Sequence, residues 1–378
     1  MNPGLPVRAD LAGVEPYGAP VLDVPNRLNV NENPYSPSAD VVAQMGRAAA
    51  DALASANRYP DRECIELRAE LASLIGGRTA AANIWPANGS NEVMHQIFAA
   101  FGGPGRRALS FAPTYSLYPQ YARETFTEYV TAPRRGDFEL DMSEVARSFT
   151  EARPSLVVVA SPNNPTGTLL PAGQLDELLD LVAGADAMLI VDEAYVEFAD
   201  VGVFSATARV PDSDRLIVTR TMSKAFGLAG LRLGYAVASA EAIDAVRIVR
   251  LPYHLSSTTQ AMACVAARNA PVLLAPVATL RAERRQQAEW FSAVGLDVAA
   301  SQANFLLVGC FADREATWRA LVDQGVLVRM VGPDGWLRVS VGTPEENQAM
   351  RQAMSIVLDS GAARLLGSGA LRDEGLQS

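Results

Sequence analysis

Lys224 is flanked in the sequence by small and apolar residues rather than by other charges. Thr221 and Ser223 precede it, and a glycine-rich segment that ends in Arg232 follows it. An amine in such surroundings is partly desolvated, which lowers its pKa and frees a nucleophile able to form a Schiff base with a carbonyl compound. The hydroxyls and Arg232 are groups that a phosphate needs nearby. The alternative is a loop lysine beside a strand, with no chemical role.

Three apolar runs, typical of buried strands, end in polar side chains. The polar residues are Asn164, Asp192 and Lys224, which follow runs at residues 156–160, 188–191 and 216–219. Repeated strand, polar tip and helix predict a mostly parallel α/β sheet with helices on both faces. In such sheets the chemistry gathers outside the carboxyl ends of the strands. We therefore expect the three side chains to share one site, although each alone is also explained as a helix cap.

These residue types match what pyridoxal phosphate (PLP) needs from a protein. Lys224 would hold the aldehyde and later move a proton, and Asp192 would keep the ring nitrogen protonated. Tyr195 and Asn164 can reach the phenolic oxygen. The candidates for the phosphate are Ser90, Thr221, Ser223 and Arg232. Ser90 lies in a Gly-Ser turn before a predicted helix, whose free N–H groups favour an anion; a simple helix cap is the alternative.

The composition excludes several other classes of protein. The chain has 378 residues, 49% of them hydrophobic and 20% charged, with a net charge of −10. The composition is that of an ordinary globular protein, and the chain is long enough for two domains. The negative net charge argues against a nucleic-acid-binding protein, whose surface would be basic. Two histidines make a histidine-based metal site unexpected, and three widely spaced cysteines indicate reduced thiols in a cytoplasmic protein. Residues 1–16 lack the apolar core of a signal peptide, and no apolar run approaches membrane-spanning length.

The order of the predicted elements suggests two α/β domains. We expect an N-terminal arm at residues 1–30, a large PLP-binding domain at 31–257, a small C-terminal domain at 258–358 and a flexible tail at 359–378. The division follows a change of pattern after Tyr253, where long alanine- and arginine-rich helical stretches replace the alternation of strands and helices. The chain has no G-x-G-x-x-G and no Walker loop, so nucleotide-binding folds lose support.

Several motifs resemble a known enzyme family. S-K-A-F-G-L-A-G-L-R-L-G-Y, V-D-E-A-Y and S-P-N-N-P-T-G together resemble the fold-type I PLP-dependent aminotransferases. N-E-N-P, R-Y-P-D, G-S-N-E, P-T-Y-S-L-Y and R-L-P-Y-H-L-S are similar to the histidinol-phosphate aminotransferase branch, in its actinobacterial form. The resemblance extends over residues 17–347. It implies a large domain with a mostly parallel sheet of the seven-stranded type, a smaller α/β domain and an N-terminal arm.

The resemblance also implies a homodimer with active sites at the interface. Tyr59 would reach the cofactor phosphate of the partner subunit, and Tyr115 would stack on the pyridine ring. Arg338, helped by Arg329, would hold the carboxylate of glutamate and then the phosphate of histidinol phosphate. The remaining residues that it places near cofactor and substrate are Tyr17, Asn33, Asn91 and Tyr253. A polar turn without a substrate contact is the alternative for Asn33.

The implied reaction is a reversible transamination between L-histidinol phosphate and 2-oxoglutarate, which gives imidazole acetol phosphate and glutamate in histidine biosynthesis. An aromatic (phenylalanine) aminotransferase and an amino-acid phosphate decarboxylase share most of these motifs and stay as alternatives. Met330 stands where the branch leads us to expect a more polar residue, and Tyr35 stands at a position that varies within the branch. Both positions bear on the acceptor pocket. A PLP-sensing regulator would need a DNA-binding segment, for which we expect no room before Tyr17.

Overall fold

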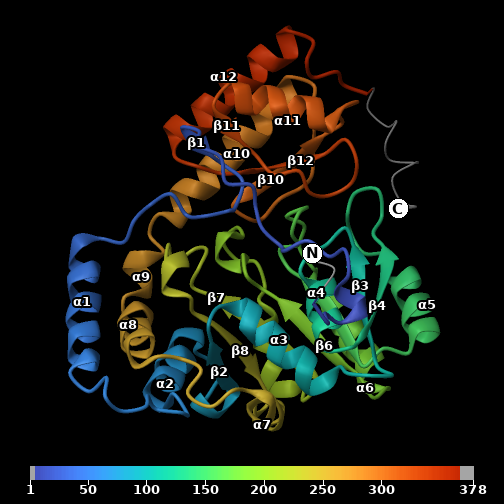
Figure 1. Cartoon of the computed structure of the whole chain (residues 1–378). Helices are drawn as coiled ribbons and strands as arrows, with labels where there is room; N and C mark the ends of the chain where they lie inside the picture. Colours follow the sequence, from blue (N-terminus) through green and yellow to red (C-terminus); the bar gives the residue numbers. More distant parts are fainter. Residues whose placement is uncertain (1–4, 367–378) are drawn as a thin grey trace.

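The computed structural model describes residues 5–366, which form a large and a small α/β part (Figure 1). The large part is built on a seven-stranded sheet in the order β2–β8–β7–β6–β5–β3–β4. The strands are β2 (Ile84–Ala87), β3 (Arg107–Ala112), β4 (Glu128–Pro133), β5 (Leu156–Ala160), β6 (Met188–Asp192), β7 (Leu216–Thr221) and β8 (Gly234–Ala238). Strand β8 pairs antiparallel with both β2 and β7, and the remaining neighbours in the sheet pair in parallel. The predicted mostly parallel sheet is therefore confirmed.

The central strands end level with one another. Ala160 on β5 pairs with Asp192 on β6, and Asp192 pairs with Thr219 on β7. Every residue of β5 and β6 is buried, as expected for strands covered on both faces. The polar residues at the carboxyl ends of these strands consequently lie side by side at one end of the sheet.

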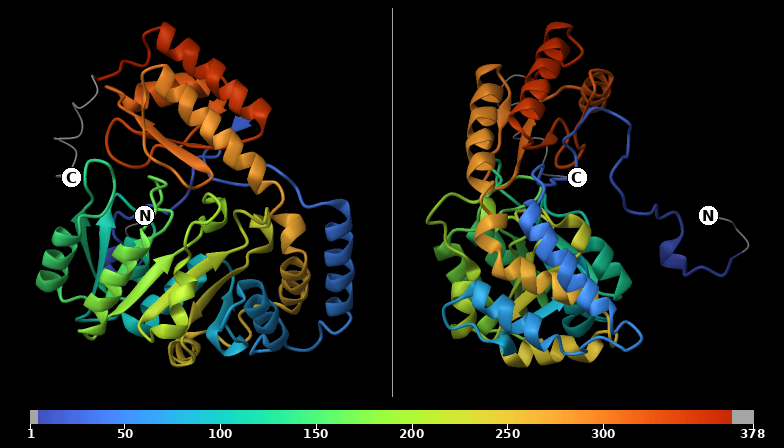
Figure 2. Two further views of the ribbon diagram at one scale, coloured as in Figure 1. Left: turned by 180° about the vertical axis from the view of Figure 1, so that it is seen from behind. Right: turned by 90° about the vertical axis from the view of Figure 1, so that its left-hand side faces the viewer.

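Helices cover both faces of the sheet (Figure 2). One face packs against α3 (Ser90–Phe101), α4 (Tyr118–Glu124) and α7 (Ala240–Val249). The other packs against α1 (Ala39–Leu53), α2 (Ile65–Ile75), α5 (Met142–Ala152), α6 (Ala172–Ala183), α8 (Ser257–Arg268) and α9 (Ala270–Leu273). Alternation along a strand divides the apolar residues between the faces: Val157 and Val159 of β5 pack on the second, and Leu156 and Val158 on the first.

The small part has its own apolar core around a three-stranded antiparallel sheet. Its elements are α10 (Val277–Ala293), β9 (Asp297–Val298), β10 (Phe305–Gly309), α11 (Arg314–Asp323), β11 (Val326–Leu327), β12 (Leu337–Ser340) and α12 (Pro344–Asp359). Helix α8, which falls within the residues expected for the small domain, instead buries Ala263 and Ala266 in the core of the large part. Part of the expected tail, residues 367–378, lies outside the described residues.

The N-terminal segment passes from the large part to the small part and back. Arg8 contacts Arg123 of the large part, strand β1 (Asn26–Arg27) pairs with β11, and the chain then returns to α1. The side view in Figure 2 shows this blue segment running outside the body of the chain. The short 3-10 helices are Ala9–Leu11, Ala81–Asn83, Val196–Phe198, Ala206–Asp212 and Ala229–Leu231.

Two features of residues 5–366 bear on function. No group of three or more histidine, cysteine, aspartate or glutamate side chains in this range could hold a metal ion. No single helix there is long and apolar enough to cross a membrane, and one bent pair, Ser257–Arg268 with Ala270–Ala293, meets the requirement by length and composition only.

Candidate active site

A cavity of about 250 Å³ lies at the carboxyl ends of β5, β6 and β7. All residues predicted for catalysis and for cofactor binding within one subunit line it: Ser90, Asn91, Tyr115, Asn164, Asp192, Tyr195, Thr221, Ser223, Lys224 and Arg232. Val30 and Glu32 from the N-terminal segment complete the lining on one side. The expectation that the three strand ends share one site therefore agrees with the placement of these side chains.

Lys224 follows β7 and reaches the cavity from the turn after the strand. Its Nζ donates a hydrogen bond of 2.9 Å to the carbonyl oxygen of Val30. Burial, followed by the charge of Arg338, lowers the pKa of Lys224 to about 8. Roughly one tenth of the amine is then neutral at pH 7, far more than for a lysine with the ordinary pKa, and the neutral amine is the nucleophilic form.

Asp192, the last residue of β6, is buried and accepts three hydrogen bonds. The donors are the hydroxyl of Tyr118 at 2.9 Å, the hydroxyl of Thr219 at 3.1 Å and the N–H of Ala194 at 3.2 Å. Burial raises the pKa of Asp192, and these three donors oppose that rise. Sequence reasoning missed Tyr118; the signal available was the three-residue spacing of Tyr115 and Tyr118 in P-T-Y-S-L-Y, of which Tyr118 is the first residue of α4.

Tyr195 and Asn164 lie on the side of the cavity that faces the small part. The hydroxyl of Tyr195 accepts a hydrogen bond of 3.1 Å from Asn31, a buried residue whose φ is +57°. Asn31 is held in turn by the hydroxyl of Ser340, which donates to its Oδ1 at 2.8 Å. Asn164 Oδ1 accepts a hydrogen bond of 2.6 Å from Arg338. Asn31 was also missed, because its partners are tertiary and the N-E-N-P segment reads as a polar turn.

The opposite end of the cavity has the features of an anion site. Helix α3 begins there at Ser90 and has no side-chain cap, so its first N–H groups face the cavity side without a capping acceptor. Arg232 donates to Ser223 at 3.3 Å. A Cβ at Gly89 would lie 2.6 Å from the Arg232 guanidinium, and one at Gly234 would overlap the backbone nitrogen of Ser90. Glycine at both positions lets the arginine and the helix start approach each other closely.

Arg338 and Arg329 lie beside the cavity, on adjacent segments of the small part. Their backbones form an antiparallel bridge, with N···O distances of 3.0 and 2.9 Å. Arg338 is buried, and its Nε has no hydrogen-bond partner among the described residues. Arg329 donates to the carbonyl of Gly18 at 3.0 Å, and its guanidinium lies 6.0 Å from the ring of Tyr17. The expected substrate residues Tyr17, Arg329 and Arg338 are thus brought together, although none of them belongs to the lining itself.

Tyr59 and Tyr253 lie away from the cavity of their own chain. Their rings stack, with centroids 4.4 Å apart and planes inclined by 16°. Tyr59 is 80% exposed and Tyr253 is 41% exposed. Asn33 is also outside the lining: it donates to the carbonyl of Ala225 at 2.9 Å and accepts from the N–H of Tyr35, so it supports the turn that follows Lys224.

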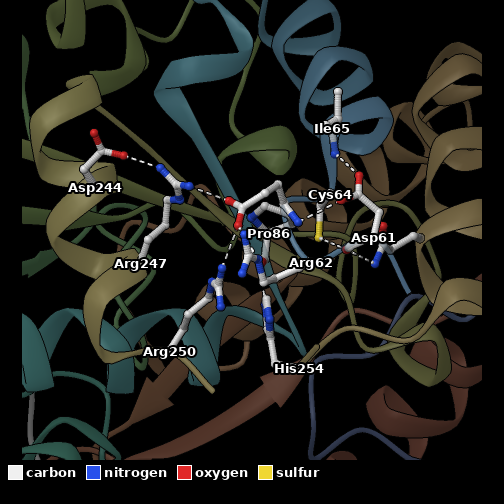
Figure 3. A network of polar contacts seen from close by, with 11 residues as sticks. Asp61, Arg62, Cys64, Ile65, Pro86, Asp244, Arg247, Arg250 and His254 are labelled. Atoms are coloured by element: carbon white, nitrogen blue, oxygen red, sulfur yellow. Dashed lines mark hydrogen bonds and ion pairs between the residues drawn. The ribbon is translucent and has the colours of Figure 1, made fainter. Parts of the chain in front are cut away.

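An ion-pair network joins the two loops that carry these tyrosines (Figure 3). Arg247 and Arg250 donate to opposite oxygens of the Glu63 carboxylate, at 2.5 and 2.9 Å. Next to them the ring of His254 forms a hydrogen bond of 2.9 Å with the carbonyl of Pro86 on β2. The network holds the two loops against each other and against the edge strand of the sheet.

Comparisons with known proteins identify the family. The model of the family Aminotransferase class I and II matches residues 26–354. Histidinol-phosphate aminotransferase of Thermobifida fusca is 52% identical and covers 93% of this chain and 95% of its own length. Histidinol-phosphate aminotransferase of Bifidobacterium longum is 48% identical, over 94% of this chain and 97% of its own length. The solved structure of histidinol-phosphate aminotransferase from Sinorhizobium meliloti in complex with pyridoxal-5'-phosphate is 26% identical, with a TM-score of 0.79 over 89% of this chain and 91% of that one. The resemblance read from the motifs is confirmed, and the chain belongs to the class I and II aminotransferases, within them to the histidinol-phosphate aminotransferases.

Proposed function

We propose that the chain transfers an amino group between L-histidinol phosphate and 2-oxoglutarate, giving imidazole acetol phosphate and glutamate in histidine biosynthesis, with PLP as its cofactor. The observation that carries the proposal is the meeting of Lys224 and Asp192 in one cavity beside Arg338. Lys224 is also the only lysine among the 32 lysines and arginines of the chain. A single ε-amine, partly buried beside a buried acid, is what the aldehyde and the ring nitrogen of PLP require.

The donor set of the cavity fits PLP. The uncapped start of α3, together with Ser223 and Arg232, suits a phosphate. Asp192 suits a protonated ring nitrogen, and Tyr115 lies in the lining where a ring can stack. Bound there, PLP supplies an electron sink that allows a proton to leave the substrate Cα.

The side chains of the cavity would divide the work of the reaction. The amine of Lys224 would hold the cofactor at rest and, once released, would move the proton of the substrate Cα, a role that its lowered pKa of about 8 favours near neutral pH. The three hydrogen-bond donors of Asp192 favour its charged form, in which it would hold a proton on the ring nitrogen. Tyr195 and Asn164 would orient and stabilise the phenolic oxygen.

The two arginines of the small part suit both substrates. Arg338 has a buried Nε that no hydrogen-bond partner meets in the part of the chain that the structure describes, and Arg329 lies beside it across the backbone bridge. A guanidinium can bind a carboxylate or a phosphate through two parallel hydrogen bonds. The same pair can therefore receive glutamate in one half-reaction and histidinol phosphate in the other, with Tyr17 at the entrance.

We further propose that the enzyme is a cytoplasmic homodimer with shared sites. The stacked Tyr59 and Tyr253 form an exposed aromatic pair, and the ion-pair network around Glu63 holds the two loops that carry them. An exposed and firmly held aromatic pair suits a contact between subunits. Tyr59 would reach the phosphate of the cofactor bound by the partner subunit, and Tyr253 the substrate there. Cys64 and Cys264 are buried thiols whose pKa burial raises to about 12, as suits a reducing compartment.

The test uses the purified chain loaded with PLP, with glutamate as donor and a panel of acceptors, and with histidinol phosphate in the reverse direction. We expect turnover of histidinol phosphate to exceed that of phenylalanine clearly. A preference for phenylalanine, or release of CO2 without consumption of 2-oxoglutarate, would overturn the substrate assignment. Borohydride treatment should fix one cofactor per chain on the peptide that contains Lys224, and Lys224→Arg is the matched control. Absence of label on that peptide would overturn the cofactor assignment.

A further inference from the structure

The two oxygens of the Asp192 carboxylate are held unequally. Within residues 5–366, Oδ1 accepts hydrogen bonds from Thr219 and from the N–H of Ala194, whereas Oδ2 accepts one, from the hydroxyl of Tyr118. A carboxylate oxygen has two acceptor sites. Oδ2 therefore keeps one acceptor site for a donor in the cavity, and Tyr118 occupies the other.

We propose that Tyr118 is a positioning residue that holds Asp192 Oδ2 in place to receive the ring N–H of the cofactor. The inference rests on the proposed PLP site and deepens it, because it names the group that orients the acid. Tyr118 is fully buried, so its hydroxyl has no water to compete with the carboxylate. The 2.9 Å bond to an ionised acceptor is of the stronger, charge-assisted kind.

The position of Tyr118 also links the acid to the predicted stacking platform. Its ring meets the ring of Tyr115 edge to face, with centroids 5.5 Å apart and an angle of 86°. Tyr118 is the first residue of α4, and Tyr115 lies three residues before it, where its carbonyl oxygen accepts a hydrogen bond of 3.2 Å from the Tyr118 N–H. One short segment of backbone thus positions both the ring of Tyr115, on which the cofactor ring would rest, and the hydroxyl of Tyr118, which holds the acid that would meet the ring nitrogen.

The hydrogen bond also favours the charged form of the acid. Burial raises the pKa of Asp192, and the hydroxyl of Tyr118 is the first of the groups that oppose it. The charge of Glu193 raises the pKa of Asp192 further, and the phenols of Tyr115, Tyr121 and Tyr195 are further titratable groups near the carboxylate. Without the Tyr118 hydroxyl, the pKa of Asp192 rises further, and a protonated acid cannot accept the ring proton.

The experiment compares Tyr118→Phe with Tyr121→Phe. Tyr121 lies in the same helix and is 4% exposed, and its hydroxyl is buried without a hydrogen-bond partner among the described residues. Tyr118→Phe should weaken PLP binding to the cofactor-free chain by roughly 10- to 100-fold and lower kcat more than it changes KM for glutamate. The acid-side transition in the absorbance of bound PLP should move to higher pH. Tyr121→Phe should leave PLP affinity and this transition as in the unaltered chain.

A double-substitution cycle separates positioning from folding. In the Asp192→Asn background the charged acceptor is gone, so adding Tyr118→Phe should change PLP affinity little further. Unchanged affinity and pH transition in Tyr118→Phe, additive losses in the double variant, or an equal loss in Tyr121→Phe would each overturn the inference. If the unaltered chain bound no PLP, the proposed function itself would fall, whereas the outcomes above leave it standing.

Discussion

Arg338 and Asn164 are joined across the two parts of the chain by a hydrogen bond of 2.6 Å. Arg338 lies on β12 of the small part, and Asn164 follows β5 of the large part. The second terminal nitrogen of Arg338 donates to the carbonyl of Asn29 at 2.8 Å, which leaves Nε buried without a partner. Its hydrogen-bond partners among the described residues include no carboxylate, so the charge of this buried guanidinium is free to meet a substrate anion.

Substitution of Arg338 should weaken both substrates together. Arg338→Gln keeps a polar side chain but removes the charge, so we expect KM for glutamate and for histidinol phosphate to rise by roughly 10- to 100-fold each. Steady-state kinetics with each substrate in turn gives the two ratios. Arg285→Gln, at an arginine whose side chain is 59% exposed, is the control and should change neither. A loss confined to one substrate would mean that the two anions use different cations.

The lowered pKa of Lys224 predicts how the cofactor-free chain captures PLP. The neutral amine reacts, so the rate of capture should rise with pH and level off above about 8 rather than near the ordinary lysine value of 10.5. The unfolded chain binds this proton more tightly than the folded one. The free energy of unfolding should therefore rise with pH between about 8 and 10.5 on account of this group.

Rapid-mixing absorbance over a series of pH values measures the capture rate, and thermal unfolding of the cofactor-free chain measures the stability. Lys224→Met is the control, since it should abolish covalent capture and remove this part of the pH dependence of stability. A capture rate that still climbed steeply as the pH approached 10.5 would show that the amine is not desolvated.

The sheet and the strand-end residues could be predicted from the sequence because both follow from local patterns. Continuous apolar runs mark strands that are buried on both faces, and the residue after such a run lies at the carboxyl end of its strand, where ligands bind in parallel sheets. Asn164, Asp192 and Lys224 were found in this way. The two-residue strand β1 could not be found, because its pairing joins residues 26–27 to 326–327 and leaves no periodic pattern in the N-terminal segment.

The supporting residues of the site escaped prediction for a related reason. Asn31 depends on Ser340, which lies 309 residues away in sequence, and Tyr118 depends on Asp192, 74 residues away. Neither dependence alters the local sequence. The alanine-rich helix α8 has small buried side chains that suit either part, and its packing against α1 and α2 places them in the core of the large one.

The ion pair of Asp200 and Arg284 joins the large part to the small part and should contribute to the free energy of unfolding. Arg284 on α10 has a side chain that is 3% exposed, and it donates to Asp200 at 2.8 Å. Asp200 also exchanges hydrogen bonds of 2.7 and 3.0 Å with Gln302. Asp200→Ala would leave a buried guanidinium without its counter-charge, so we expect the free energy of unfolding to fall by about 1–2 kcal/mol. Urea unfolding measures this, and Asp214→Ala, at a 79% exposed carboxylate, should change it by much less. Equal effects of the two changes would mean that the pair is not a stabilising contact.

A site shared between subunits predicts that two inactive variants complement each other. Lys224→Ala removes the amine, and Tyr59→Ala removes the tyrosine that would reach the partner's cofactor. In a mixed dimer one site carries both defects, whereas the other combines an intact Lys224 from one chain with an intact Tyr59 from its partner. Random mixing makes about half of the dimers mixed, each with one native site, so the activity should recover to roughly a quarter of that of the unaltered enzyme.

The measurement is the histidinol-phosphate activity after the two chains have been unfolded and refolded together. The same procedure with Lys224→Ala and Asp192→Ala is the control: both defects lie in the same cavity of one chain, so a mixed dimer has no native site and should show no recovery. The two mixtures should differ clearly, because Tyr59 is exposed and lies outside the cavity of its own chain, so it would complete only the site of the partner. If the first mixture stayed as inactive as the control, Tyr59 would serve only its own chain, and the shared site would have to be abandoned.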